Sequence, residues 1–208
     1  SFYEWKKEAA RRGLPILNTT AEALEVIKRG KKKGLNVTCE TAPHYFTLTD
    51  EAVGEYRTFA KMNPPLRSEK DRKAVYDAVC SGLIDAIATD HAPHDVEAKR
   101  LPFAEAASGI VGLETLLPLS LVLYHKKNIS LKDLLAKLTY QPADIIGVNK
   151  GRIKKGAAAD LTLIDLDAEW KIDPEKFHSR SKNSPFESHK VKGRAVKTFV
   201  AGNLVYQF

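Results

Sequence analysis

The sequence contains few of the residues that would cross-link a small secreted domain or anchor a chain in a membrane. Its 208 residues include two cysteines, Cys39 and Cys80, and one methionine, Met62. Two cysteines cannot form a disulfide framework, and both lie among apolar neighbours, so we expect reduced core residues. No apolar run approaches the roughly 20 residues that a membrane-spanning helix needs. Residues 1–7 already include three charged side chains, Glu4, Lys6 and Lys7, and do not resemble a signal peptide. We therefore expect a cytoplasmic protein that does not bind membranes.

Aromatic residues are sparse as well, at 8% of the chain. None is interleaved with the basic residues at 6–7, 11–12 and 28–33. A nucleic-acid surface would combine the two types, so the net charge of +7 is better explained by solvated helix faces. The apolar content of 43% and charged content of 28% are those of an ordinary globular protein, large enough for one domain or a domain plus a small module.

The first part of the chain alternates between helical and extended patterns. Extended patterns at 14–17, 35–39 and 84–89 alternate with helical patterns at 3–12, 19–33 and 68–79. A capping box, Thr19 with Glu22, begins the second helix. Residues 59–61 are expected to be extended and to lead into a rigid loop with two prolines at 63–67. This alternation predicts parallel βα units, and the long polar segments after the second and third strands, 40–50 and 90–108, are typical of a barrel enzyme.

The character of the sequence changes near residue 151. Before it we expect helices at 113–126 and 131–139 and a short helix that begins at Pro142. After it, short alternating strands are expected at 161–164, 191–196, 198–200 and 204–206, with a hairpin turn at Gly202-Asn203. We therefore expect barrel structure over residues 1–150 and a small β module over 151–208.

The most informative segment is the apolar strand pattern that runs into Asp90, His91 and His94. A carboxylate and two imidazoles at the end of a buried strand form the position where barrel enzymes place metal ligands or proton-transfer groups. The alternative interpretation is a polar turn with an aspartate cap.

Several motifs together resemble those of a known family. They are Thr-Ala-Pro-His at 41–44, Asn-Pro-Pro-Leu-Arg at 63–67, Ala-Thr-Asp-His-Ala-Pro-His at 88–94, Ser-Gly-Ile-Val-Gly-Leu-Glu-Thr at 108–115, and the tail segments 156–161 and 202–206. In this order and spacing they resemble the type I dihydroorotase branch of the amidohydrolase superfamily, over nearly all residues from 19 to 208.

The resemblance implies a metal-dependent (β/α)₈ barrel with a small β-sandwich built from both chain ends. It implies reversible hydrolysis of dihydroorotate to N-carbamoyl-aspartate in pyrimidine synthesis, with one or two zinc ions per site. Asp90 would ligate the metal and carry a proton from the attacking water to the leaving nitrogen. Asn63, His94 and backbone groups near Gly109 would bind the substrate, and His91 would have a supporting role.

One further histidine of the motifs stays undecided at the sequence level. His44 is not expected to be a metal ligand, and whether its role is structural or functional stays open.

Some features of the family are absent from the sequence. It contains no His-x-His pair and no histidine before His44, and only two complete barrel strands are evident. We infer either a chain gap near residues 14–18 or a natural deletion.

Three functions then stay open. The chain is part of a dihydroorotase, or an inactive relative that assembles with aspartate transcarbamoylase, or part of another cyclic-amide hydrolase such as a hydantoinase or allantoinase. A small-molecule substrate is expected in the first and third cases, and a homodimer is compatible with each.

Overall fold

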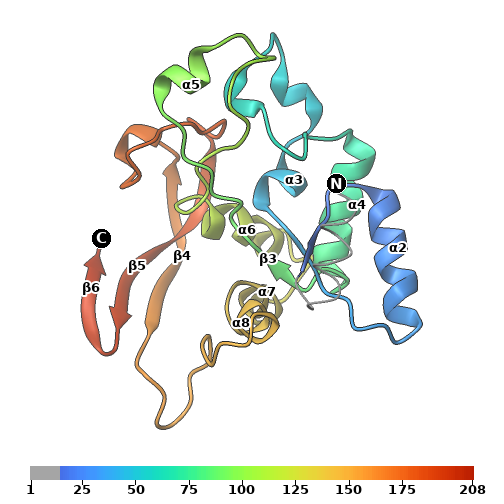
Figure 1. Ribbon diagram of the computed structural model, residues 1–208. Helices are drawn as coiled ribbons and strands as arrows, with labels where there is room; N and C mark the ends of the chain where they lie inside the picture. Colours follow the sequence, from blue (N-terminus) through green and yellow to red (C-terminus); the bar gives the residue numbers. More distant parts are fainter. Residues whose placement is uncertain (1–14) are drawn as a thin grey trace.

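The computed structural model describes residues 15–208, and Figure 1 shows their arrangement. β1 (Ile16–Leu17), β2 (Cys39–Thr41) and β3 (Ala86–Ile87) form a parallel sheet in sequence order. The predicted helix at 3–12 and the start of the first predicted strand lie outside the described residues. The remainder of that predicted strand contains β1. The parallel strands and their connecting helices agree with the predicted incomplete α/β barrel.

The helices occupy most of the predicted positions. They are α2 (Ala21–Lys32), α3 (Pro43–Thr47), α4 (Glu69–Cys80), α5 (Val96–Arg100), α6 (Leu116–His125), α7 (Leu131–Leu138) and α8 (Tyr140–Ile145), with short 3₁₀ turns η1 (Asp50–Val53), η2 (Thr58–Ala60) and η3 (Pro174–Lys176). α2 and α4 contact each other beside the parallel sheet, whereas α6 contacts α7.

Several local predictions were wrong in detail. The cap of α2 is Thr20, whose hydroxyl accepts a hydrogen bond from the Ala23 amide, so the capping residue is one later than Thr19. Residues 58–60 form η2 and are not extended. The polar segments 40–50 and 90–108 contain the helices α3 and α5, whose five residues each are too short for a periodic signal.

The second sheet is antiparallel and lies on the other side of α6 (Figure 1). It consists of β4 (Leu161–Lys171), β5 (Lys190–Val200) and β6 (Asn203–Gln207). The two strands predicted between 191 and 200 are one strand, β5. The β5–β6 turn also differs from the prediction, because Ala201 and Gly202 carry the positive φ values of 48° and 84° and the next residue already belongs to β6.

One helix joins the two sheets through close packing. Gly193 of β5 faces Leu121 of α6, and a Cβ atom at that glycine would lie 2.3 Å from the Leu121 Cδ1 atom. Leu121 is fully buried, as are Ile110, Leu134, Ile172 and Phe186. The apolar core is therefore continuous from the parallel sheet through α6 to the C-terminal segment. No helix within residues 15–208 is long and apolar enough to cross a membrane.

Candidate functional site

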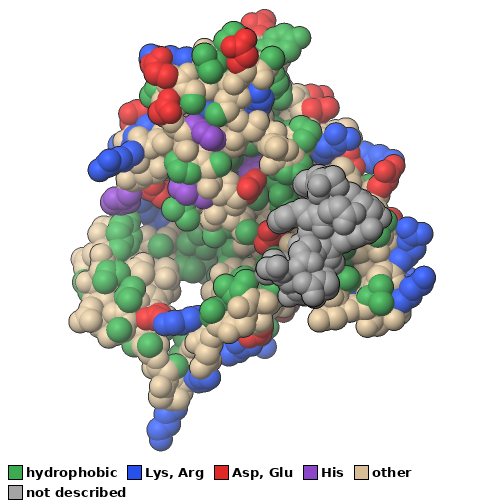
Figure 2. Space-filling view, in the orientation of Figure 1, with side chains coloured by type: hydrophobic (Ala, Val, Ile, Leu, Met, Phe, Trp, Pro, Cys, Tyr) green, Lys and Arg blue, Asp and Glu red, His purple; other side chains and the backbone are tan. Residues whose placement is uncertain are grey.

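The loops that follow β2 and β3 lie at the same edge of the parallel sheet. β2 and β3 pair in register, with Thr41 opposite Ile87, and the Ala88 amide donates to the Thr41 carbonyl. Because parallel strands end at one edge, this pairing brings the segment with His44 next to the segment with Asp90. In Figure 2 the histidine side chains gather in the upper left part of the face in view, above the hollow beside the second sheet.

Asp90 has an uncommon backbone conformation at the end of this edge. Its φ is 50°, in the left-handed region that aspartate tolerates better than most residues. Its side chain is 40% exposed, and its Oδ2 atom lies 3.6 Å from the Nε2 atom of His44. Left-handed residues other than glycine are concentrated at functional sites, where the surrounding structure holds them. The carboxylate is therefore accessible, and an imidazole lies on one side of it.

His44 lies beneath that carboxylate and is almost fully buried, at 2% exposure. Its Nε2 atom is buried without a hydrogen-bond partner, and the Asp90 carboxylate lies 3.6 Å from it. Burial lowers the pKa of the His44 imidazole, with the Asp90 carboxylate opposing the effect. Burial and the Asp90 charge together raise the pKa of the nearby Glu40 carboxyl. The buried His44 imidazole thus lies beside the exposed Asp90 carboxylate.

The loop that contains His94 lies against the segment 107–112. The His94 Nε2 atom lies 2.8 Å from the Ser108 carbonyl oxygen. Gly109 has φ of 116°, and a Cβ atom there would lie 2.5 Å from the Ala92 Cβ atom. Only glycine fits this conformation and this spacing. The predicted substrate-binding residues His94 and Gly109 are therefore neighbours.

Asn63 reaches the same region through its backbone neighbours. The Gly109 amide donates a 2.8 Å hydrogen bond to the Lys61 carbonyl, which places the Asn63 segment beside residues 108–110. The Asn63–Pro64 peptide bond is cis, and the Asn63 side chain is exposed. The structure thus gathers three loops at this edge, and within residues 15–208 the Asn63 side chain makes no hydrogen bond to Asp90, His94 or Gly109.

His91 supports the arrangement from below. Its Nδ1 atom accepts a 3.1 Å hydrogen bond from the Gly112 amide, and its backbone pairs with Ile110 in a parallel bridge. This bond occupies one ring nitrogen with a backbone amide, and the supporting role of His91 stays a prediction.

Sequence reasoning missed two buried side chains in this region. Lys99 of α5 is 2% exposed, and its Nζ atom donates to the carbonyls of Ala107 and Gly109 at 2.8 and 3.1 Å. Asn183, from the segment between β4 and β5, is equally buried and donates to the Gly109 carbonyl as well. A lysine within a polar segment and an asparagine in a loop carry no periodic signal of burial, so the sequence offered no means of finding them.

Residues 15–208 do not by themselves form a metal centre. Within residues 15–208, no group of three His, Cys, Asp or Glu side chains could hold an ion. A catalytic zinc needs about three protein ligands, and Asp90 has one imidazole near it. The described chain therefore offers one accessible carboxylate and not a complete ligand set.

Comparison with known proteins gives consistent relationships. A model of the amidohydrolase family matches residues 5–205. The chain is 58% identical over 188 residues to a dihydroorotase of Wolbachia sp. subsp. Brugia malayi, covering 90% of this chain and 42% of that protein. It is 56% identical over 189 residues to a dihydroorotase of Ehrlichia chaffeensis, covering 91% of this chain and 42% of that protein. The chain thus spans less than half the length of these relatives.

Solved structures with a similar fold are hydantoinases and dihydropyrimidinases by name. The L-hydantoinase (dihydropyrimidinase) of Arthrobacter aurescens has a TM-score of 0.89 at 33% identity, with 97% of this chain and 46% of that chain covered. The dihydropyrimidinase of Brevibacillus agri has a TM-score of 0.87 at 25% identity, with 93% and 44% covered. These matches confirm the predicted relation to the TIM-barrel enzymes of the superfamily, whose members generally depend on a metal. Its sequence and its fold together show that the chain belongs to the amidohydrolase family.

Proposed function

We propose that the protein to which this chain belongs is a dihydroorotase, which hydrolyses the cyclic amide of dihydroorotate reversibly to N-carbamoyl-aspartate in pyrimidine synthesis. The proposal depends chiefly on one observation. At one edge of the parallel sheet, the accessible Asp90 carboxylate lies beside a buried imidazole and near the loops of His94, Gly109 and Asn63. The names of relatives at 51–58% identity support it.

Each site residue then has a chemical role. Asp90 takes the proton of the attacking water and delivers it to the nitrogen that leaves when the ring opens, as a general base and then a general acid. His44 limits the rotation of the Asp90 carboxylate from its buried side. His94, Asn63 and backbone groups near Gly109 bind the carboxylate and ring atoms of the substrate, because together they supply an imidazole, an amide and a glycine that permits close approach.

The metal belongs to the whole protein. We propose one or two zinc ions, with Asp90 as the ligand that this chain contributes and the remaining ligands in parts of the protein outside it. Zinc at such a site would lower the pKa of a bound water to near neutral, so that the water can act as a nucleophile. We also propose a cytoplasmic enzyme in which residues 1–150 belong to the barrel and 151–208 to a β module.

Two alternatives have specific support. The lack of a three-ligand group within residues 15–208 favours an inactive relative that assembles with aspartate transcarbamoylase. The likeness to an L-hydantoinase favours a different cyclic amide as substrate. The higher identity to the dihydroorotases, 58% against 33%, is the reason for preferring dihydroorotate.

Two measurements distinguish these functions. The intact mass and zinc content of the protein purified from its source come first, followed by assays with dihydroorotate and with hydantoin. A protein near twice the 23.1 kDa of this chain, with bound zinc and turnover of dihydroorotate, supports the proposal. A zinc-free protein of 23.1 kDa that is inactive would support the scaffold, and preference for hydantoin would support the third function.

The isolated chain provides a further test of the incomplete ligand set. The 208-residue chain should remain inactive towards dihydroorotate when zinc is added, because Asp90 alone cannot hold the ion. Measurable turnover by this chain would contradict the account of the metal ligands.

A further inference from the structure

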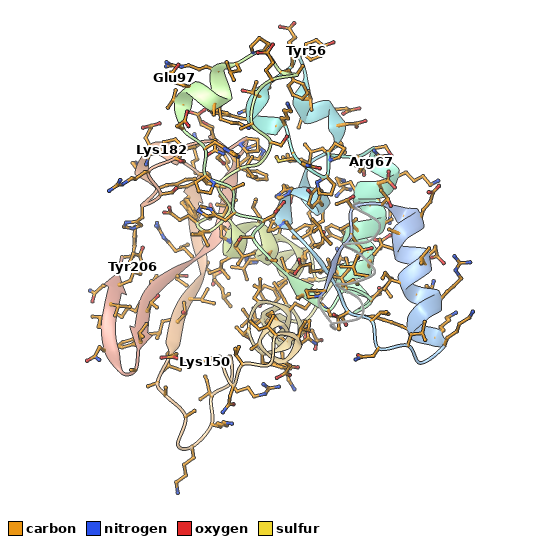
Figure 3. All side chains as sticks on the ribbon, viewed as in Figure 1. Tyr56, Arg67, Glu97, Lys150, Lys182 and Tyr206 are labelled. Atoms are coloured by element: carbon orange, nitrogen blue, oxygen red, sulfur yellow. The ribbon has the colours of Figure 1, made fainter. Side chains whose placement is uncertain are left out.

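Asn183 connects the C-terminal segment to the candidate site. It lies between β4 and β5 and is 2% exposed. Its neighbour Lys182 lies on the same side of the molecule as Glu97 of α5 in Figure 3. The Asn183 carbonyl accepts a 3.1 Å hydrogen bond from the Val111 amide. The backbone of the C-terminal segment is thus paired with the segment that follows Gly109.

The side-chain amide of Asn183 spans two site loops. Its Nδ2 atom donates to the Ala92 carbonyl at 2.9 Å and to the Gly109 carbonyl at 3.1 Å. Its Oδ1 atom accepts from the His94 amide at 3.3 Å. An asparagine amide has two donor hydrogens and one acceptor oxygen, and all of them are used here. Aspartate has the same shape but lacks the donors.

These bonds join residues that are far apart in the sequence. Asn183 is 91 positions from Ala92 and 74 positions from Gly109. The two loops also contact each other directly, because the Ala92 amide donates to the Ile110 carbonyl at 2.8 Å. Lys99 donates to the same Gly109 carbonyl. A buried polar network whose members are all satisfied holds one arrangement of its loops, and an unpaired member weakens it.

We propose that Asn183 is a positioning residue for substrate binding, which sets the separation between the His94 loop and Gly109. This inference rests on the proposed function, because His94 and Gly109 bind substrate only under that proposal. With Asn183, the residues that shape the substrate site include the segment between β4 and β5 as well as the barrel loops. Asn183 acts from the C-terminal segment by fixing the distance between two groups that bind substrate.

The test uses Asn183→Asp and Asn183→Ser in the full-length protein. Asn128→Asp is the matched control, since the Asn128 amide is exposed and makes one 2.7 Å bond to the Tyr76 hydroxyl. With either Asn183 variant, KM for dihydroorotate should rise about tenfold or more while kcat changes less than about threefold, as expected when binding groups are displaced. Hydrogen exchange at residues 91–94 and 108–112 should become faster, and the control should change neither quantity.

The outcomes separate positioning from general stability. Unchanged KM and unchanged exchange in a folded Asn183→Asp protein would overturn the proposal. Faster exchange spread over the whole parallel sheet, with kcat reduced as much as kcat/KM, would also overturn it, because it indicates loss of stability. If the wild-type protein does not turn over dihydroorotate, the proposed function fails. The exchange at the His94 and Val111 amides then still decides whether Asn183 holds the two loops together.

Discussion

The ionisation of Lys99 offers a quantitative test of how the site loops are held. Lys99 is buried, and burial together with the nearby charge of Lys61 lowers its pKa from 10.5 to about 8. Its Nζ atom holds the carbonyls of Ala107 and Gly109. A neutral amine still has two hydrogens for these two acceptors, so the bonds survive deprotonation. The two hydrogen bonds of Lys99 therefore do not require its positive charge.

The sign of the pH dependence follows from the direction of the shift. Below pH 8 both the folded and the unfolded chain carry the proton, and the folded state bears the full cost of a buried ammonium ion. Between pH 8 and 10.5 the folded state loses the proton first, so the unfolded state binds more protons and stability rises with pH. With pKa values of about 8 and 10.5, the contribution of Lys99 to the free energy of unfolding rises by about 2.5 kcal/mol from pH 7 to pH 10.

The measurement is urea unfolding of the full-length protein and of Lys99→Met at several pH values in this range, followed by tryptophan fluorescence. Other groups titrate in both proteins, so the informative quantity is the difference between the two curves. That difference should widen in favour of the wild type by about 2.5 kcal/mol as pH rises. Lys70→Met, at an exposed position of α4, is the control. The difference in unfolding free energy between the wild type and Lys70→Met should stay constant as pH rises. Parallel curves for the wild type and Lys99→Met would refute the reasoning.

Three further predictions concern single residues. Asp90→Ala in the full-length protein should abolish turnover of dihydroorotate while the melting temperature stays within a few degrees, because the side chain is 40% exposed; near-normal activity would contradict its role in proton transfer. Gly109→Ala should destabilise the protein by about 1–3 kcal/mol and raise KM, because the new Cβ atom would lie 2.5 Å from Ala92. Gly82→Ala shares a positive φ but has no atom within 4 Å of the new Cβ, so it should leave KM unchanged, and equal effects on KM would argue against crowding at Gly109. Cys39 is fully buried and burial raises the pKa of its thiol to about 11, so in the native protein at pH 8 a thiol reagent should modify the half-buried Cys80 first; the reverse order, read by mass spectrometry, would contradict the burial of Cys39.

Local sequence patterns were sufficient for the longer helices. α2, α4, α6 and α7 lie where helical periodicity and capping residues predicted them, within a few residues. β3 is shorter than the strand predicted at 84–89 and lies within it. The alternation of these elements predicted parallel βα units, and the strands pair in that way. The five-residue helices α3 and α5 were missed because one helical turn shows no period.

The order and chemistry of the residues by themselves determined that a carboxylate and two histidines end a buried strand and that glycine and asparagine motifs accompany them. Only the tertiary structure decided that His44 lies beneath Asp90 and that Lys99 and Asn183 meet at the Gly109 carbonyl. The physical reason is distance along the chain. Periodicity and capping act over a few residues, whereas these hydrogen bonds depend on how β3, α5 and the segment before β5 pack together, and a polar side chain in a loop gives no local sign that it will be buried.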